Sequence, residues 1–152
     1  MTAVLRPGLL AGVTVNCADD AIAARLRELG AAPGDSVLVH RAADPADADG
    51  VRAALDEAWD AIRATALPPA ATDRLIVLIA PPPGTPDRAA ARAGLENLAR
   101  TLSIEWARHA IRPVALLPGE RTTSAELAEL VAFLASPAGA YYAGCAFTLR
   151  SA

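Results

Sequence analysis

The chain has 152 residues, of which 53% are hydrophobic and 20% charged, and its formal net charge is −3. This composition excludes a disordered segment and predicts a single domain over residues 1–152, long enough to bury a core. The acidic balance argues against nucleic acid as a partner, because a phosphate backbone attracts basic surfaces.

The first third of the chain predicts a strand, a helix and a second strand. The run "VTVNC", 13–17, is apolar and β-branched, which is typical of a buried strand. Asp19 can cap a helix that ends at Gly30. The apolar face of this helix carries Ile22, Leu26 and Leu29. A "PGD" turn then leads into the predicted strand 36–41.

The middle of the chain predicts a helix and a central strand. An acidic loop offers Asp47 or Asp49 as the N-cap of a helix that runs to about Ala66, where the prolines at 68 and 69 stop it. Its apolar face carries Val51, Leu55, Trp59 and Ile62. The continuous apolar run 74–80 predicts a parallel strand that is covered on both faces.

The last third predicts two helices and two strands. After the loop "PPPGTP", a long helix has an apolar stripe of Ala91, Leu95, Leu98, Leu102 and Trp106. A strand follows over 111–119, and Thr123 with Glu126 forms a capping box at the start of the last helix. Pro137 ends that helix, and the run 145–149 predicts the last strand.

Strand and helix therefore alternate along the whole chain. This pattern predicts an α/β fold: a shortened, Rossmann-like, doubly wound sheet of about five mainly parallel strands with helices on both faces.

The two cysteines, Cys17 and Cys145, fall in apolar, strand-like stretches and are expected to be free. They are too few for a disulfide framework or a cysteine-rich metal site. No run approaches the ~18 apolar residues of a membrane span. The run 8–18 is interrupted by glycine and leads into a helix, so we do not interpret it as a signal peptide, and the cytoplasm is the expected location.

Two stretches carry a family resemblance. The sequence "ARAGLENLARTLSIEWARHAIRPVALLPG", 91–119, resembles the long helix and following strand of the short-chain dehydrogenases/reductases. The sequence "AELVAFLASPAGAYYAGCAFTL", 128–149, is similar to the last helix and strand of that family. Residues 12–31 match more loosely, and the middle of the chain is too short to align. The resemblance implies a nicotinamide-dependent oxidoreductase scaffold.

The residues that carry the family's chemistry are replaced in this alignment. A tyrosine acts there as general acid/base beside a lysine four residues on, and these positions are Arg88 and Arg92 here. Arginine stays charged near neutral pH and cannot exchange a proton. The catalytic serine position falls at Ala80 or Pro81.

The glycine-rich turn that cradles a dinucleotide pyrophosphate is replaced as well. The first strand is followed by "NCADDA", in which Asp19 and Asp20 would repel a diphosphate. Arg41, at the end of the second predicted strand, is in the place where an enzyme of this family would hold the 2′-phosphate of NADP. The family's fourth strand with its "NNAG" segment has no counterpart, so we expect that strand and a neighbour to be deleted. We expect no bound cofactor and no metal.

These replacements predict a non-catalytic subunit, a pseudoenzyme, that associates with a catalytically complete short-chain dehydrogenase/reductase. The resemblance implies that the long helix and the helix before it pair with the same helices of a neighbouring subunit, and that the last helix and strand form a second interface. The candidate interface residues are Trp59, Leu95, Leu98, Leu102, Trp106, Tyr141 and Phe147.

Two alternatives remain open. Arg88 and Arg92, one helical turn apart, could grip a carboxylate or phosphate, which would make the chain an anion-binding or regulatory domain. Cys17 and His40 end adjacent predicted strands and could form a nucleophile and base. His109 most simply complements a helix C-terminus.

Overall fold

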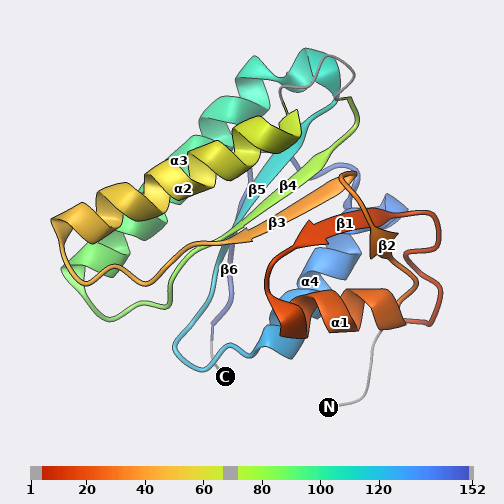
Figure 1. The fold of residues 1–152 in the computed structure, drawn as a ribbon, viewed down its shortest axis with the longest axis horizontal. Helices are drawn as coiled ribbons and strands as arrows, with labels where there is room; N and C mark the ends of the chain where they lie inside the picture. Colours follow the sequence, from red (N-terminus) through yellow and green to blue (C-terminus); the bar gives the residue numbers. More distant parts are fainter. Residues whose placement is uncertain (1–4, 67–71, 151–152) are drawn as a thin grey trace.

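The computed structural model describes residues 5–66 and 72–150 (Figure 1). In these residues, six parallel strands form one sheet in the order β2-β1-β3-β4-β5-β6. The strands are β1 (Thr14–Cys17), β2 (Ala32–Pro33), β3 (Val37–Arg41), β4 (Leu75–Ile79), β5 (Arg112–Leu117) and β6 (Ala146–Thr148). The helices are α1 (Asp20–Glu28), α2 (Ala48–Ala66), α3 (Pro86–Glu105) and α4 (Ser124–Ala135), with the 3-10 turns η1 (Ala107–His109) and η2 (Pro137–Gly139).

The α/β doubly wound prediction is confirmed, with one strand more than the five expected. The additional strand is β2, which has only two residues and falls where the sequence predicts a turn. Two residues, the second of them a proline, are too few to form the apolar run by which a strand is predicted from sequence.

The predicted helix caps are found in the structure. Asp47 caps α2, because its Oδ1 accepts a hydrogen bond from the Gly50 N–H at 2.8 Å. The capping box of α4 is complete between Thr123 and Glu126. The prolines predicted to stop α2, at 68 and 69, lie outside the described residues.

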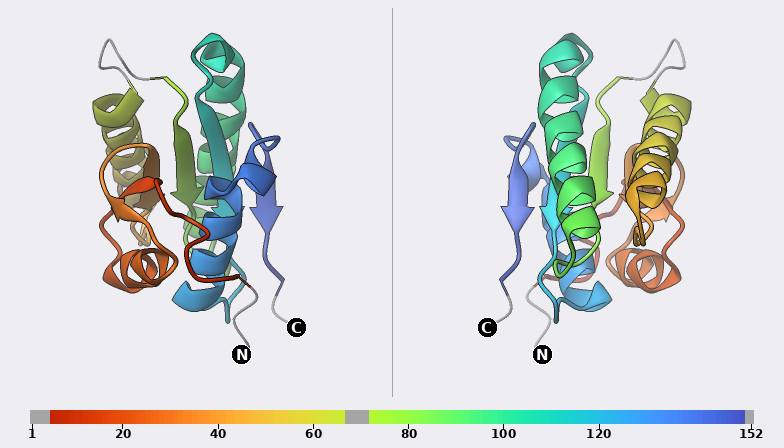
Figure 2. Two further views of the ribbon diagram at one scale, coloured as in Figure 1. Left: turned by 90° about the vertical axis from the view of Figure 1, so that its right-hand side faces the viewer. Right: turned by 90° about the vertical axis from the view of Figure 1, so that its left-hand side faces the viewer.

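The sheet is covered on both faces, by α1 with α4 on one and α2 with α3 on the other (Figure 2). The central strand β4 alternates between the two cores. Leu75, Val77 and Ile79 face α1 and α4, whereas Ile76 and Leu78 face α2 and α3. Each of these side chains is at most 1% exposed, and burying one contributes on the order of 2 kcal/mol.

The strand order shows where the scaffold is shortened. In the usual doubly wound order, the fourth strand lies beside the first, on the side opposite the second. Here β3 occupies that place, because it pairs with β1 on the side opposite β2. The expectation that the family's fourth strand is deleted is therefore wrong. The shortening lies at the sheet edge, where no described strand continues beyond β2.

The chain passes from β2 to β3 through only three residues, 34–36, which cross one face of β1. Val15 of β1 is paired with Pro33 on one side and with Val37 on the other. Parallel strands usually need a crossover of a dozen or more residues. This one can be short because β2 ends after two residues, at the level where β3 begins.

Hydrogen bonds fasten the crossover to β1. The Ser36 hydroxyl donates to the Thr14 carbonyl at 2.7 Å and accepts from the Thr14 N–H at 2.8 Å. Gly34 has φ +150°, a conformation that L-residues rarely adopt, and an added Cβ would lie 2.7 Å from the Cβ of Thr14. The crossover therefore requires glycine at position 34.

We predict that Gly34→Ala destabilises the fold more than Gly12→Ala. Gly12 also has a positive φ, +87°, but an added Cβ would meet nothing within 4 Å. Gly12→Ala should therefore cost only the backbone strain, about 1–2 kcal/mol, and Gly34→Ala about 1–3 kcal/mol more because of the clash with Thr14. Urea unfolding of both variants measures the difference. Equal losses would show that the crossover can move away from Thr14.

Candidate functional site

Ligands of doubly wound sheets bind outside the carboxyl ends of the strands, where the strand order reverses. In this chain that point lies between β1 and β3, because β2 and β3 lie on opposite sides of β1. A cavity of ≈ 350 Å³ lies there. It is lined by Ala18, Asp19, Val39, His40, Arg41 and Ala42.

The N-terminus of α1, at this point, is occupied by a side chain of the protein itself. Asp19 is the N-cap, and its Oδ1 accepts hydrogen bonds from the N–H groups of Ala21 and Ile22, both at 3.1 Å. These are the kind of amides that bind phosphate at other helix N-termini. The Asp19 carboxylate thus takes the place that an anionic ligand would need.

Arg41 ion-pairs with Asp19 across the point of strand reversal. Its Nη1 lies 2.7 Å from Asp19 Oδ2 and also donates to the Ser124 hydroxyl at 3.3 Å. Burial alone would raise the pKa of Asp19, but the hydrogen bonds from Ile22 and Arg41 hold it below its ordinary value. Arg41 is the last residue of β3, which lies beside β1 on the side opposite β2. The prediction that Arg41 ends the second strand is therefore wrong.

Arg88, in the first turn of α3, is held by the loop after β3. Its Nε donates to Asp44 Oδ1 at 2.6 Å and its Nη2 pairs with Asp44 Oδ2. A third bond runs from Nη1 to the Pro83 carbonyl at 3.3 Å. The hydrogen bonds with Arg88 hold the pKa of the Asp44 carboxyl below its usual value.

Arg92 lies one turn further along α3 and bridges the ends of two strands. Its Nη1 donates to the carbonyl of Pro81, after β4, at 2.7 Å and to that of Pro118, after β5, at 2.9 Å. Burial lowers the pKa of Arg92 from its ordinary value. Arg88 and Arg92 thus have separate partners, and the structure does not bring the two guanidinium groups together on one ligand site.

Arg92 also lines a second cavity, of ≈ 480 Å³, near the ends of β5 and β6. Arg121 and Arg150 line the same space, and Glu120 contributes one carboxylate. Three arginines and one acid line it, so this cavity is more cationic than the cavity beside Asp19. In the described part of the chain, no group of three or more His, Cys, Asp or Glu side chains could hold a metal ion.

Cys17 and His40 do not form a nucleophile and base. Cys17 packs against the core under α1 and α4, whereas His40 alternates with Val39 on β3 and faces the opposite side of the sheet. Burial raises the pKa of the Cys17 thiol, the reverse of what an activated cysteine needs. Burial also lowers the pKa of His40.

The candidate interface residues divide into buried and exposed ones. Leu95 and Leu102 are 0% and 3% exposed, so they belong to the core between α2, α3 and the sheet and cannot reach a partner. Leu98 is partly buried against the same core. Trp59 is 37% exposed and stacks on Trp106, with ring centroids 6.3 Å apart.

Of the last two candidates, Tyr141 is exposed and Phe147 is partly buried. Tyr141 is 93% exposed, and Phe147 packs edge-on against Tyr142 at 5.3 Å between ring centroids. Ile104, near the end of α3, is 75% exposed. Ile104 is not among the predicted interface residues because it lies outside the apolar stripe of its helix. Asp44 was not predicted either, because it belongs to no motif; its only signal is its place in an acidic loop.

No family model and no curated protein sequence matches the chain. Several solved structures are similar to it. A citronellol catabolism dehydrogenase from Pseudomonas aeruginosa PAO1 has a TM-score of 0.73 and 19% identity, over 98% of this chain and 98% of that chain. A short-chain dehydrogenase/reductase family oxidoreductase from Burkholderia thailandensis has a TM-score of 0.65 and 20% identity, over 86% and 67%. Acetoin dehydrogenase from Enterobacter cloacae has a TM-score of 0.60 and 22% identity, over 75% and 62%.

The chain therefore has the fold of the short-chain dehydrogenases, as the resemblance predicted, and spans only 62% of the acetoin dehydrogenase chain. At these identities the likeness is one of fold. In the described residues, no helix has the length and hydropathy of a membrane span.

We predict that Asp19→Ala lowers the free energy of unfolding in a pH-dependent way. The pKa of Asp19 is depressed in the folded protein, so its charge stabilises the fold above the unfolded-state pKa of about 4, and this contribution is lost as pH falls through the folded-state value. Losing the cap should cost about 1–2 kcal/mol at pH 7 and less at pH 3.

Urea unfolding at both pH values measures the loss, with Asp20→Ala as the control, because Asp20 lies in the same turn without capping it. The same loss for Asp19→Ala at pH 3 and pH 7 would contradict the role assigned to the carboxylate.

Proposed function

We propose that the chain is a non-catalytic subunit that associates with a catalytically complete short-chain dehydrogenase/reductase acting on a keto or hydroxy substrate. One observation carries the proposal: Asp19 engages the N–H groups of Ala21 and Ile22 and is itself paired with Arg41. A dinucleotide pyrophosphate would have to displace both the cap and the ion pair, and would meet a carboxylate in the place of a glycine turn.

The environment of Arg88 and Arg92 supports the same proposal. The resemblance places them at the positions of the acid/base tyrosine and its lysine, and a guanidinium does not exchange protons near neutral pH. Both side chains contribute to the fold instead, through Asp44 and through the carbonyls of Pro81 and Pro118.

The association part of the proposal rests on exposed apolar side chains. Trp59 on α2 and Ile104 on α3 lie on the helix pair that the resemblance assigns to subunit contacts, and Tyr141 precedes the edge strand β6. Large apolar and aromatic residues are frequent anchors of protein interfaces. The similar structures are dehydrogenases and oxidoreductases by name, which favours an oxidoreductase as the partner.

A second candidate function is anion binding, favoured by the cavity that Arg92, Arg121 and Arg150 line. A half-buried guanidinium bonded only to neutral carbonyls, as Arg92 is among the described residues, would gain from a phosphate or carboxylate counter-ion. This candidate keeps Arg92 from the sequence-based hypothesis and replaces Arg88 with Arg121 and Arg150.

We predict that the isolated protein does not bind NADH or NADPH. Calorimetric titration at concentrations that saturate a catalytic short-chain dehydrogenase, used as the positive control, should give no saturable heat. Titration with inorganic phosphate separates the two candidates: binding that is lost in Arg92→Gln supports the anion-binding domain. Saturable dinucleotide binding would contradict the non-catalytic assignment.

We predict that Ile104→Glu abolishes assembly with the catalytic partner and leaves the subunit folded, because the side chain is 75% exposed. Co-expression with the short-chain dehydrogenases encoded beside its gene, followed by size-exclusion chromatography, measures assembly. Ala24→Glu places the same charge on an exposed site of α1, on the other face of the sheet, and should leave the complex intact. A protein that forms no complex with any of these dehydrogenases would contradict the proposal.

A further inference from the structure

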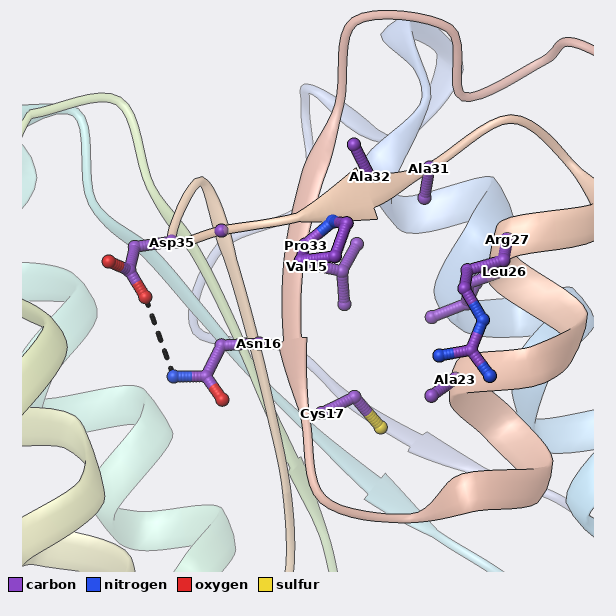
Figure 3. Close-up of a pocket in the computed structure, with 11 residues that line it drawn as sticks. Val15, Asn16, Cys17, Ala23, Leu26, Arg27, Ala31, Ala32, Pro33 and Asp35 are labelled. Atoms are coloured by element: carbon purple, nitrogen blue, oxygen red, sulfur yellow. Dashed lines mark hydrogen bonds between the residues drawn. The ribbon is translucent and has the colours of Figure 1, made fainter.

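A third cavity, of ≈ 360 Å³, lies at the edge of the sheet between β1, α1 and β2 (Figure 3). Its walls are mostly apolar. The apolar lining residues are Val15, Ala23, Leu26, Ala31, Ala32 and Pro33. Neither Arg92 nor Arg41 lines it, so this cavity is separate from both cavities at the carboxyl edge.

The cavity exists because β2 is short. β2 pairs with only Thr14 and Val15, and the chain then leaves the edge to cross β1. A longer strand would continue alongside Asn16 and Cys17. Instead, α1 extends past the end of β2, and the space beneath the helix remains unfilled (Figure 3).

One cation borders this apolar space. The Arg27 side chain runs along α1 toward Ala23, and the Cys17 thiol points toward the helix from the opposite wall (Figure 3). Among the described residues, the Arg27 guanidinium has no ion pair or hydrogen bond. Its neighbour Arg25, by contrast, is paired with Glu28 and Glu129.

The acidic residue of the lining, Asp35, points away from Arg27. The Asp35 carboxylate accepts a hydrogen bond from the Asn16 amide at 3.4 Å, on the side of β1 away from Arg27 (Figure 3). The positive charge of Arg27 is therefore not balanced within the cavity. A ligand with a negative group would supply that balance and a hydrogen-bonding partner for the guanidinium fork.

We propose that this cavity binds a small amphipathic monocarboxylate, with the carboxylate on Arg27 and the apolar body against Val15, Leu26 and Pro33. The volume is at the lower end of the range for small-molecule sites, roughly 300–1,000 Å³, which suits a medium-chain fatty acid or an aryl-alkanoic acid. This inference goes beyond the proposed function, because it does not depend on a catalytic partner or on the carboxyl edge.

Octanoate is the probe of charge selectivity, with octylamine and octanol as matched controls of the same chain length. Calorimetric titration should show octanoate binding at least tenfold more tightly than octanol, and no binding of octylamine. Arg27→Gln should weaken octanoate at least tenfold and leave octanol within about twofold, because it removes one bidentate charge-assisted contact. Arg63→Gln, at an exposed site on α2, should change nothing.

The two cysteines report where the probe binds. Saturating octanoate should slow iodoacetamide alkylation of Cys17 at least fivefold, measured by peptide mass spectrometry, while Cys145, which does not line the cavity, reacts as before. Ala23→Leu, which fills the cavity without changing its charge, should abolish both binding and protection.

Four results would overturn the proposal. They are no octanoate binding, equal affinity for octanoate and octylamine, an unchanged octanoate affinity in Arg27→Gln, and displacement of octanoate by NADPH, which would make the cavity part of a nucleotide site. If the unsubstituted protein assembles with its partner but does not bind octanoate, this inference alone is refuted and the proposed function stands.

Discussion

The chain must pass from one side of β1 to the other within residues 34–36, and this constraint shapes the N-terminal half of the molecule. The crossover can be this short only if β2 ends at the level where β3 begins, as the shared pairing of Val15 shows. It also needs glycine at position 34, where a side chain would meet Thr14. The bare edge of β1, and the cavity beneath α1, follow from the same geometry.

At the carboxyl edge, charged side chains of the protein bind its own backbone and one another. A helix N-terminus attracts negative charge, and Asp19 supplies it from within the chain. That carboxylate then pairs with Arg41 of the neighbouring strand. Arg88 and Arg92 tie α3 to the loop after β3 and to the ends of β4 and β5. These four side chains therefore hold neighbouring elements together.

Much of the fold could be predicted from local signals. Apolar runs and caps such as Asp19, Asp47 and Thr123 act within a few residues, and the structure confirms them. The strand order could not be predicted, because pairing partners depend on contacts distant in sequence. β2 was missed because its two residues form no apolar run, and the strand that ends at Arg41 was therefore assigned to the wrong place in the sheet.

The candidate site was predictable only in part, for the same reason. Residue identities place Arg88 and Arg92 one turn apart, but their partners come from loops that the fold brings near α3. Helical spacing groups Leu95 and Leu102 with the aromatic residues, and it cannot tell which side of the helix faces the sheet.

The stack of Trp59 on Trp106 has a consequence for how the protein can be observed. The chain contains two tryptophans, and both are in this one contact between α2 and the end of α3. Tryptophan fluorescence therefore reports the packing of α2 against the end of α3. Local loosening of α1 and β2 would leave the tryptophan emission unchanged, so that part of the molecule needs a separate label.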